Sequence, residues 1–159
     1  MKYNSARVTI SDRTVLVKYR DRVFTSVYPM SVEAMPVHHV DVMIWLLLWG
    51  HGVSPVVNGM EVPEYFAVGA DHSRPNTGKS LLCYSAGADS TAAMAIYPST
   101  GAIIRRIYDR LYNATQVAMA DAMGVLVIDS DFELARMLLG KSHGFNIGCG
   151  YVPSPPLYL

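Results

Sequence analysis

The fold is decided by the stretch LLCYSAGADST at residues 81–91. Its apolar start predicts a short strand, its small residues predict a tight loop, and Asp89 begins a helix-opening sequence. In such a unit the first N–H groups of the helix have no partner within the helix, and the helix dipole favours negative charge there. We therefore expect a phosphate group at this loop, with hydroxyl donors from Ser85 and Ser90 and close backbone approach at Gly87. Asp89 is expected to hold a metal ion or to cap the helix.

The residues after this loop predict further alternation of strands and helices. Strand, helix, strand and helix are expected in turn over residues 101–109, 113–123, 125–129 and 132–139. Gly124 stands where the first of these helices would end. The resulting βαβαβα order predicts an α/β fold of Rossmann-like type, with a parallel sheet and right-handed crossovers.

Two aspartates are expected near the loop. Asp109 would end the second strand and Asp129 the third, and the carboxyl ends of parallel strands line the ligand crevice of such sheets. An alternative is that residues 129–131 only cap the following helix, with Asp131 as the N-cap.

Residues 85–90, Ser-Ala-Gly-Ala-Asp-Ser, resemble the pyrophosphate loop of the N-type ATP pyrophosphatases. This PP-loop superfamily has the HUP fold, and its loop is usually written Ser-Gly-Gly-x-Asp-Ser. The stretch MGVLVID at 123–129 is similar to the 7-cyano-7-deazaguanine synthase branch. The resemblance covers roughly residues 80–145. Ala86 replaces the first glycine of the motif, and it costs about 1 kcal/mol if that position needs a positive φ.

The resemblance implies an enzyme that binds ATP with Mg²⁺. Such an enzyme transfers AMP to a carboxylate, amide or carbonyl oxygen of a small-molecule or protein acceptor and releases pyrophosphate, whose charge must be neutralised. The cofactor-binding residues that it implies are Ser85, Ala86, Gly87, Ala88, Asp89, Ser90, Thr91 and Asp109. Asp89 and Ser90 would be catalytic, and Asp89 and Asp129 would hold the Mg²⁺.

The chain also departs from this family. It has Cys149 alone where the deazaguanine branch has a four-cysteine zinc site, and three parallel strands make a small sheet for the fold. We therefore expect a homo-oligomer or a hetero-partner that completes the sheet. Two other functions stay open: an ATP-binding module without catalysis, and a structural or assembly protein whose loop only looks like a phosphate site.

The first 75 residues differ from the rest. Alternating runs predict an antiparallel meander of strands over 7–10, 14–19 and 22–27. An apolar helix is expected from residue 36 or 37 to about 49, and residues 50–80 are expected to form a loop or linker. We predict an N-terminal region over 1–75 and a nucleotide-binding α/β domain over 76–159, incomplete at its C-terminal end.

Composition narrows the class of protein. Of the 159 residues, 51% are hydrophobic and 16% charged, which predicts buried surface against a partner or against another copy of the chain. The net charge of +0 does not indicate nucleic-acid binding. The apolar run at 40–49 is too short to span a bilayer. Without a targeting segment or a CxxC pair, the chain is predicted to be cytoplasmic, with Cys83 and Cys149 reduced.

Two other motifs do not predict a binding site. Residues 77–80, Thr-Gly-Lys-Ser, imitate the end of a Walker A loop, but Ser73 stands where that motif needs glycine, and the residues precede a strand. His38 and His39 would point to different sides of a helix, which favours structural roles over a shared metal ion.

Overall fold

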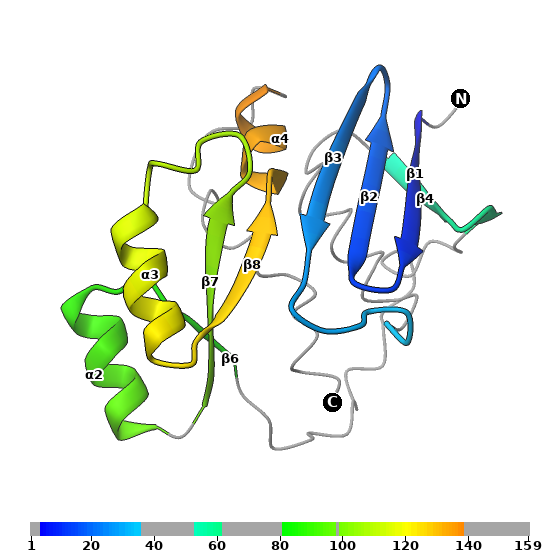
Figure 1. Ribbon diagram of the computed structural model, residues 1–159. Coiled ribbons are helices and arrows are strands. Elements are labelled where there is room, and N and C mark those ends of the chain that lie inside the picture. Colours follow the sequence, from blue (N-terminus) through cyan, green and yellow to red (C-terminus); the bar gives the residue numbers. More distant parts are fainter. Residues whose placement is uncertain (1–3, 36–52, 62–80, 98, 139–159) are drawn as a thin grey trace.

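The computed structural model describes residues 4–35, 53–61, 81–97 and 99–138 of the chain. These residues form one mixed sheet of eight strands with three helices beside it (Figure 1). The strands are β1 Asn4–Ser11, β2 Thr14–Tyr19, β3 Arg22–Val27, β4 Val53–Val57, β5 Met60–Glu61, β6 Leu81–Cys83, β7 Thr100–Arg106 and β8 Leu126–Ser130. The helices are α2 Ala88–Ile96, α3 Ala114–Ala122 and α4 Phe132–Leu138. No helix among the described residues is long and apolar enough to cross a membrane.

The strand order in the sheet is β5-β4-β1-β2-β3-β8-β7-β6. The meander β1–β2–β3 is antiparallel, and β4 pairs parallel to β1 on its outer side. The other half, β6, β7 and β8, is parallel throughout. The chain therefore joins an antiparallel half and a parallel half in a single sheet.

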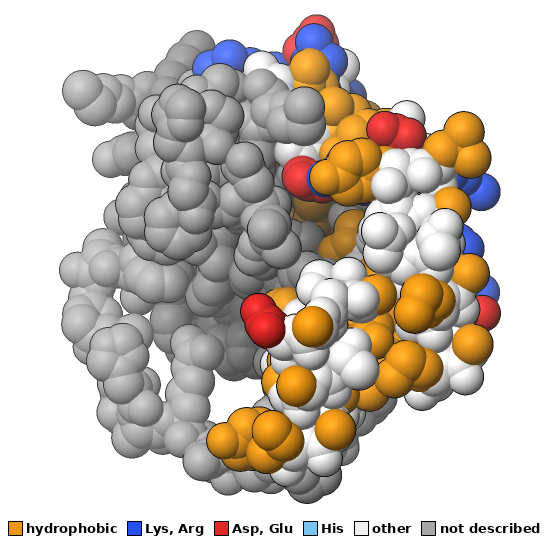
Figure 2. Space-filling model, turned by 90° about the vertical axis from the view of Figure 1, so that its left-hand side faces the viewer, with side chains coloured by type: hydrophobic (Ala, Val, Ile, Leu, Met, Phe, Trp, Pro, Cys, Tyr) orange, Lys and Arg blue, Asp and Glu red, His pale blue; other side chains and the backbone are white. Residues whose placement is uncertain are grey.

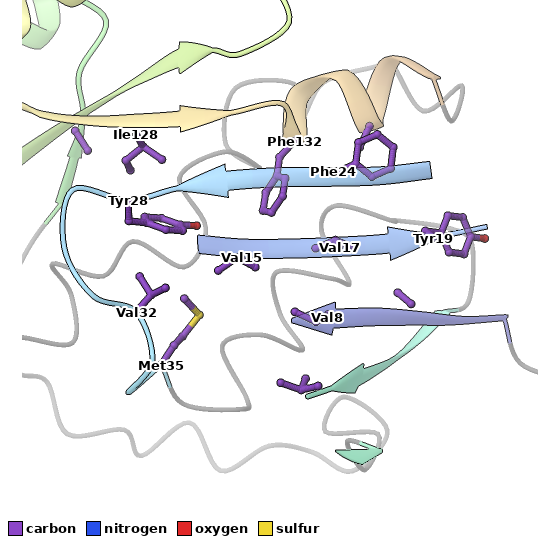
Figure 3. Close-up of a cluster of buried hydrophobic side chains, with 14 residues drawn as sticks. Val8, Val15, Val17, Tyr19, Phe24, Tyr28, Val32, Met35, Ile128 and Phe132 are labelled. Atoms are coloured by element: carbon purple, nitrogen blue, oxygen red, sulfur yellow. The ribbon is translucent and has the colours of Figure 1, made fainter. Parts of the chain in front are cut away.

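The antiparallel half follows from strict alternation along its strands. In β2, Val15, Val17 and Tyr19 are buried, whereas Leu16 and Lys18 point to the other face. The buried set joins Phe24 and other apolar residues in one cluster, which continues to Phe132 and Ala135 of α4 (Figure 3). This period of two is what a sheet with one buried face requires.

The parallel half has apolar residues on both faces. Ala102 and Ile104 of β7 belong to the same cluster as α4, whereas Ile103 belongs to a second cluster with Val117 and Ala120 of α3. Figure 1 shows α2 and α3 together on one side of β7 and β8. Burial on both faces explains why these strands read as continuous apolar runs.

A short joint connects the two halves. β3 and β8 pair antiparallel through only two residue pairs, Ser26–Ser130 and Val27–Asp129. Asp131 extends the joint, because its N–H donates to the Thr25 carbonyl at 3.0 Å and its carboxylate accepts from the Thr25 N–H at 2.5 Å. The Asp131 carboxylate thus takes the place of a further main-chain partner for β3.

The predicted fold class is wrong. The sheet is mixed, because β3 adds antiparallel to β8 and so makes the meander part of the same sheet. The expected linker at 50–80 contains the strands β4 and β5. They pair as a hairpin at the far end of that sheet, and Asn58 and Gly59 form its turn. The helix expected from residue 36 or 37, and the boundary at 75/76, lie outside the described residues.

Candidate phosphate-binding loop

The loop after β6 is held at its start by Tyr84. The Tyr84 N–H donates to the Ala102 carbonyl at 2.8 Å, so the residue continues the pairing of β6 with β7. Its buried ring places the hydroxyl 3.1 Å from Thr91 Oγ1 on α2 and 3.4 Å from the sulfur of Met123, just after α3. Tyr84 therefore links the loop, α2 and the end of α3.

Ala86 adopts the left-handed conformation, with φ +57°. This is the position where the PP-loop motif has glycine. An L-residue other than glycine bears about 1 kcal/mol of strain here. Strain of this kind persists only where the surrounding structure fixes it, and it is enriched at ligand-binding sites.

Gly87 is the N-cap of α2, with extended φ −81° and ψ 168°. Having no side chain, it leaves α2 without a side-chain cap in the described structure. The first turn, Ala88 to Ser90, begins directly behind it, so these N–H groups have no partner earlier in the helix. Asp89 is exposed in this turn and complements the helix dipole.

Serine and threonine hydroxyls fix the loop from within. Ser90 Oγ donates to the Gly87 carbonyl at 3.1 Å and lies 3.2 Å from Ser85 Oγ, while Thr91 Oγ1 donates to the same carbonyl at 2.9 Å. The N–H of Ser85 donates to Ser90 Oγ at 3.3 Å. Several of these bonds are long, and both serine hydroxyls lie beside the uncapped helix end, so either can turn towards an anion.

The predicted loop residues 85–91 thus lie together, and Asp129 is on β8, with β7 between it and β6. Cys83 is opposite Ala102 and Asp129 is opposite Arg105. The end of β6 at Cys83 is therefore three residues of strand, about 10 Å along the sheet, from the level of Asp129, and β7 lies between β6 and β8. β7 ends at Arg106, so Asp109 is not at a strand end as expected but in the turn that precedes α3.

Asp129 forms an ion pair with Arg105. Arg105 Nε and Nη2 donate to its two carboxylate oxygens at 2.5 and 2.7 Å. The hydrogen bond to Asp129 raises the pKa of Arg105, against a smaller opposing effect of burial. In the part of the chain that the structure describes, no three His, Cys, Asp or Glu side chains are grouped to hold a metal ion. The Asp129 carboxylate is engaged by Arg105, and a Mg²⁺ site at Asp89 and Asp129 stays a prediction.

A second ion pair, not predicted from the sequence, lies at the end of β7. Arg106 Nε and Nη2 donate to Glu133 of α4 at 2.6 and 2.7 Å, and the Arg106 guanidinium lies 3.4 Å from the ring centroid of Tyr112. The Tyr108 hydroxyl donates to the same carboxylate, and burial with the nearby Glu133 charge raises the pKa of Tyr108 to about 12. The sequence signal that could have indicated these ion pairs is the two adjacent arginines, Arg105 and Arg106, at the end of an apolar strand.

No protein-family model, no curated protein and no solved structure matches this chain.

Proposed function

We propose that the loop at residues 85–90 binds the phosphate groups of a nucleotide such as ATP. The observation that carries the proposal is the start of α2. Gly87 leaves the first-turn N–H groups without a side-chain cap, and the hydroxyls of Ser85 and Ser90 lie next to them. A phosphate group would accept hydrogen bonds from these N–H groups and complement the helix dipole. The strained Ala86, which sets the turn before Gly87, supports the same proposal.

Binding without adenylation is the function that the geometry supports best. The adenylating activity remains a prediction from the resemblance of residues 85–90, and it needs charge neutralisation beyond the loop. Asp129, which would share the metal ion, is paired with Arg105 and lies on β8, with β7 between it and β6. Ser90 would donate to the phosphate from the loop, whereas the role of Asp89 as a metal ligand remains a prediction from the resemblance.

The proposal is tested by filling the cap position. Gly87→Asp places a carboxylate where the phosphate would sit, and the backbone angles at Gly87 suit any residue. The added Cβ meets only Ser85 Oγ, at 3.3 Å, which can rotate away. The variant should unfold at the same or a higher temperature than the wild type, because a capped helix is more stable, yet lose ATP binding at least tenfold in calorimetry.

Thr115→Asp is the matched control. Thr115 is exposed in the first turn of α3, so the variant adds the same charge near the N-terminus of a different helix. It should bind ATP as the wild type does. Failure of the folded wild type to bind ATP, Mg²⁺-ATP or pyrophosphate would overturn the proposal, as would equal loss in both variants.

A further inference from the structure

We propose that the end of the meander at the β2–β3 turn binds the phosphate backbone of a nucleic-acid duplex. This basic end is defined by four exposed cations: Arg7 of β1, Lys18 of β2, Arg20 in the turn and Arg22 at the start of β3. The inference is independent of phosphate binding at residues 85–90, which follow β6 at the far edge of the sheet.

The first observation is an uneven division of charge between the two halves of the molecule. Residues 4–28 have five Lys or Arg against two Asp, a net charge of +3. Residues 81–138 have four Arg against six Asp or Glu, a net charge of −2. The side of the molecule that carries α2 and α3 is accordingly mainly hydrophobic, with Lys and Arg at its margins (Figure 2). The net charge of +0 for the whole chain therefore conceals a basic region on the meander.

The second observation is that strand pairing brings the four cations to one end of the meander. Arg7 is directly opposite Lys18. Arg22 is opposite Tyr19, and Arg20 follows Tyr19 in the turn. From the spacing of strands and of residues along them, the four Cα atoms lie within about 12 Å of one another. Figure 1 shows this end, with the β2–β3 turn and the start of β1, away from α2.

The charges of the basic end are not neutralised by the described part of the chain. None of the ion pairs among the described residues includes any of the four cations. Like charges that are directly opposite on antiparallel strands, as Arg7 and Lys18 are, destabilise the pair. Arg20 has φ +56°, a backbone conformation that glycine adopts at lower cost. A polyanion bound here would offset the repulsion among these side chains.

The chemistry of the four side chains fits phosphate groups. Three of them are arginines, whose planar guanidinium groups donate two parallel hydrogen bonds to a phosphate. A duplex has one negative charge for about each 1.7 Å of its axis, so a stretch of about 12 Å presents several phosphates to the basic end.

The surroundings of the basic end favour a duplex over other anionic partners. A protein interface or a membrane surface needs apolar or aromatic anchors, and the turn itself consists of Arg20 and Asp21. A single strand needs exposed aromatic rings for its bases, but Tyr19 and Phe24, the aromatic residues of β2 and β3, are only 1% and 2% exposed. Contacts to the backbone of a duplex require neither feature.

The test is binding of the full chain to a fluorescent DNA duplex of about 20 base pairs, measured by anisotropy. Four phosphate contacts should weaken binding about 100-fold between about 50 and 200 mM salt. Arg7→Gln and Lys18→Gln should each weaken binding at least threefold and reduce the salt dependence by about one contact, whatever the base sequence. Both variants should unfold at the same or a higher temperature than the wild type, because each removes a like-charge pair.

Arg13→Gln is the matched control. Arg13 is also exposed and carries the same charge, but it lies in the β1–β2 turn at the opposite end of the meander. This variant should bind the duplex as the wild type does. Equal losses in Arg13→Gln and Lys18→Gln would overturn the proposal, because the effect would then follow from net charge alone.

Three further probes separate this site from other sites and partners. Gly87→Asp should bind the duplex as the wild type does, and a loss in this variant would assign the binding to the loop at 85–90. Phosphatidylserine vesicles and polyglutamate represent a membrane and an acidic protein. Tighter binding to either of them than to the duplex, or no binding of the duplex at about 50 mM salt, would overturn the proposal.

Discussion

The antiparallel meander and the parallel half use the same sheet in different ways. In β2, Val15 and Val17 are fully buried, and they share one cluster with Phe132 of α4. In the parallel half, α2 buries none of its side chains, and α3 buries Val117 and Ala120. The comparison indicates that stability comes mainly from the meander and α4, whereas α2 and α3 leave much of their surface open.

The largest effect is expected from Phe132→Ala. Phe132 is fully buried at the start of α4, where it packs with residues of the meander, so its removal leaves a cavity between the halves. We expect a loss of about 3–5 kcal/mol in the free energy of unfolding, measured with urea. Ile96→Ala, at an exposed position, should cost less than about 0.5 kcal/mol. Similar losses in both variants would remove the distinction between the two halves.

A smaller loss in the free energy of unfolding is expected for Asp131→Ala, which removes a hydrogen bond at the joint between β3 and β8. The variant removes the acceptor for the Thr25 N–H, which is part-buried. The cost should be about 1–3 kcal/mol, because the freed donor loses its partner. Asp131→Asn keeps an oxygen acceptor and should cost less than Asp131→Ala. The two urea curves test this, and an equal loss in both variants would show that the carboxylate charge, not the acceptor, matters.

The contact between Asp131 and Thr25 also predicts how stability depends on pH. Burial raises the pKa of Asp131 above its ordinary value of 3.8, although the bond from Thr25 opposes this. The fold therefore favours the neutral carboxyl, so this contribution to stability is present below pH 3.8 and is lost as the pH rises through the folded-state pKa. The unfolding free energy of the wild type minus that of Asp131→Asn should fall from pH 4 to pH 7. A difference that rises over this range would contradict the assigned direction.

Local structure could be predicted from the sequence because the relevant signals are local. Alternation of apolar and polar residues predicted the meander strands. Gly124, with φ +74°, follows the C-cap of α3 in the left-handed conformation that often ends a helix. The loop at 85–90 lies between a strand and a helix as expected, because small residues and Asp89 determine that turn without distant contacts.

The arrangement of the sheet could not be predicted in the same way. The joint depends on Asp131 bonding to Thr25, and these residues are 106 positions apart in the chain. Nothing in the pattern of β3 says whether its free edge meets β8, β6 or another chain. The sequence also could not distinguish Asp129 as a metal ligand from Asp129 as the partner of Arg105, because that choice depends on the register of β7 and β8.

The smallest change in stability is expected at Ala86, which has a strained left-handed backbone conformation in the parallel half. Ala86→Gly should remove the cost of a left-handed alanine, about 1 kcal/mol, but glycine also gives the unfolded chain more freedom. The net gain should be about 0.5 kcal/mol, or one to two degrees in the unfolding temperature. Ala93→Gly, inside α2, should act in the opposite direction and cost about 1 kcal/mol. If Ala86→Gly instead destabilises the protein, the left-handed turn is not the conformation in solution, and the phosphate site built on that turn loses its support.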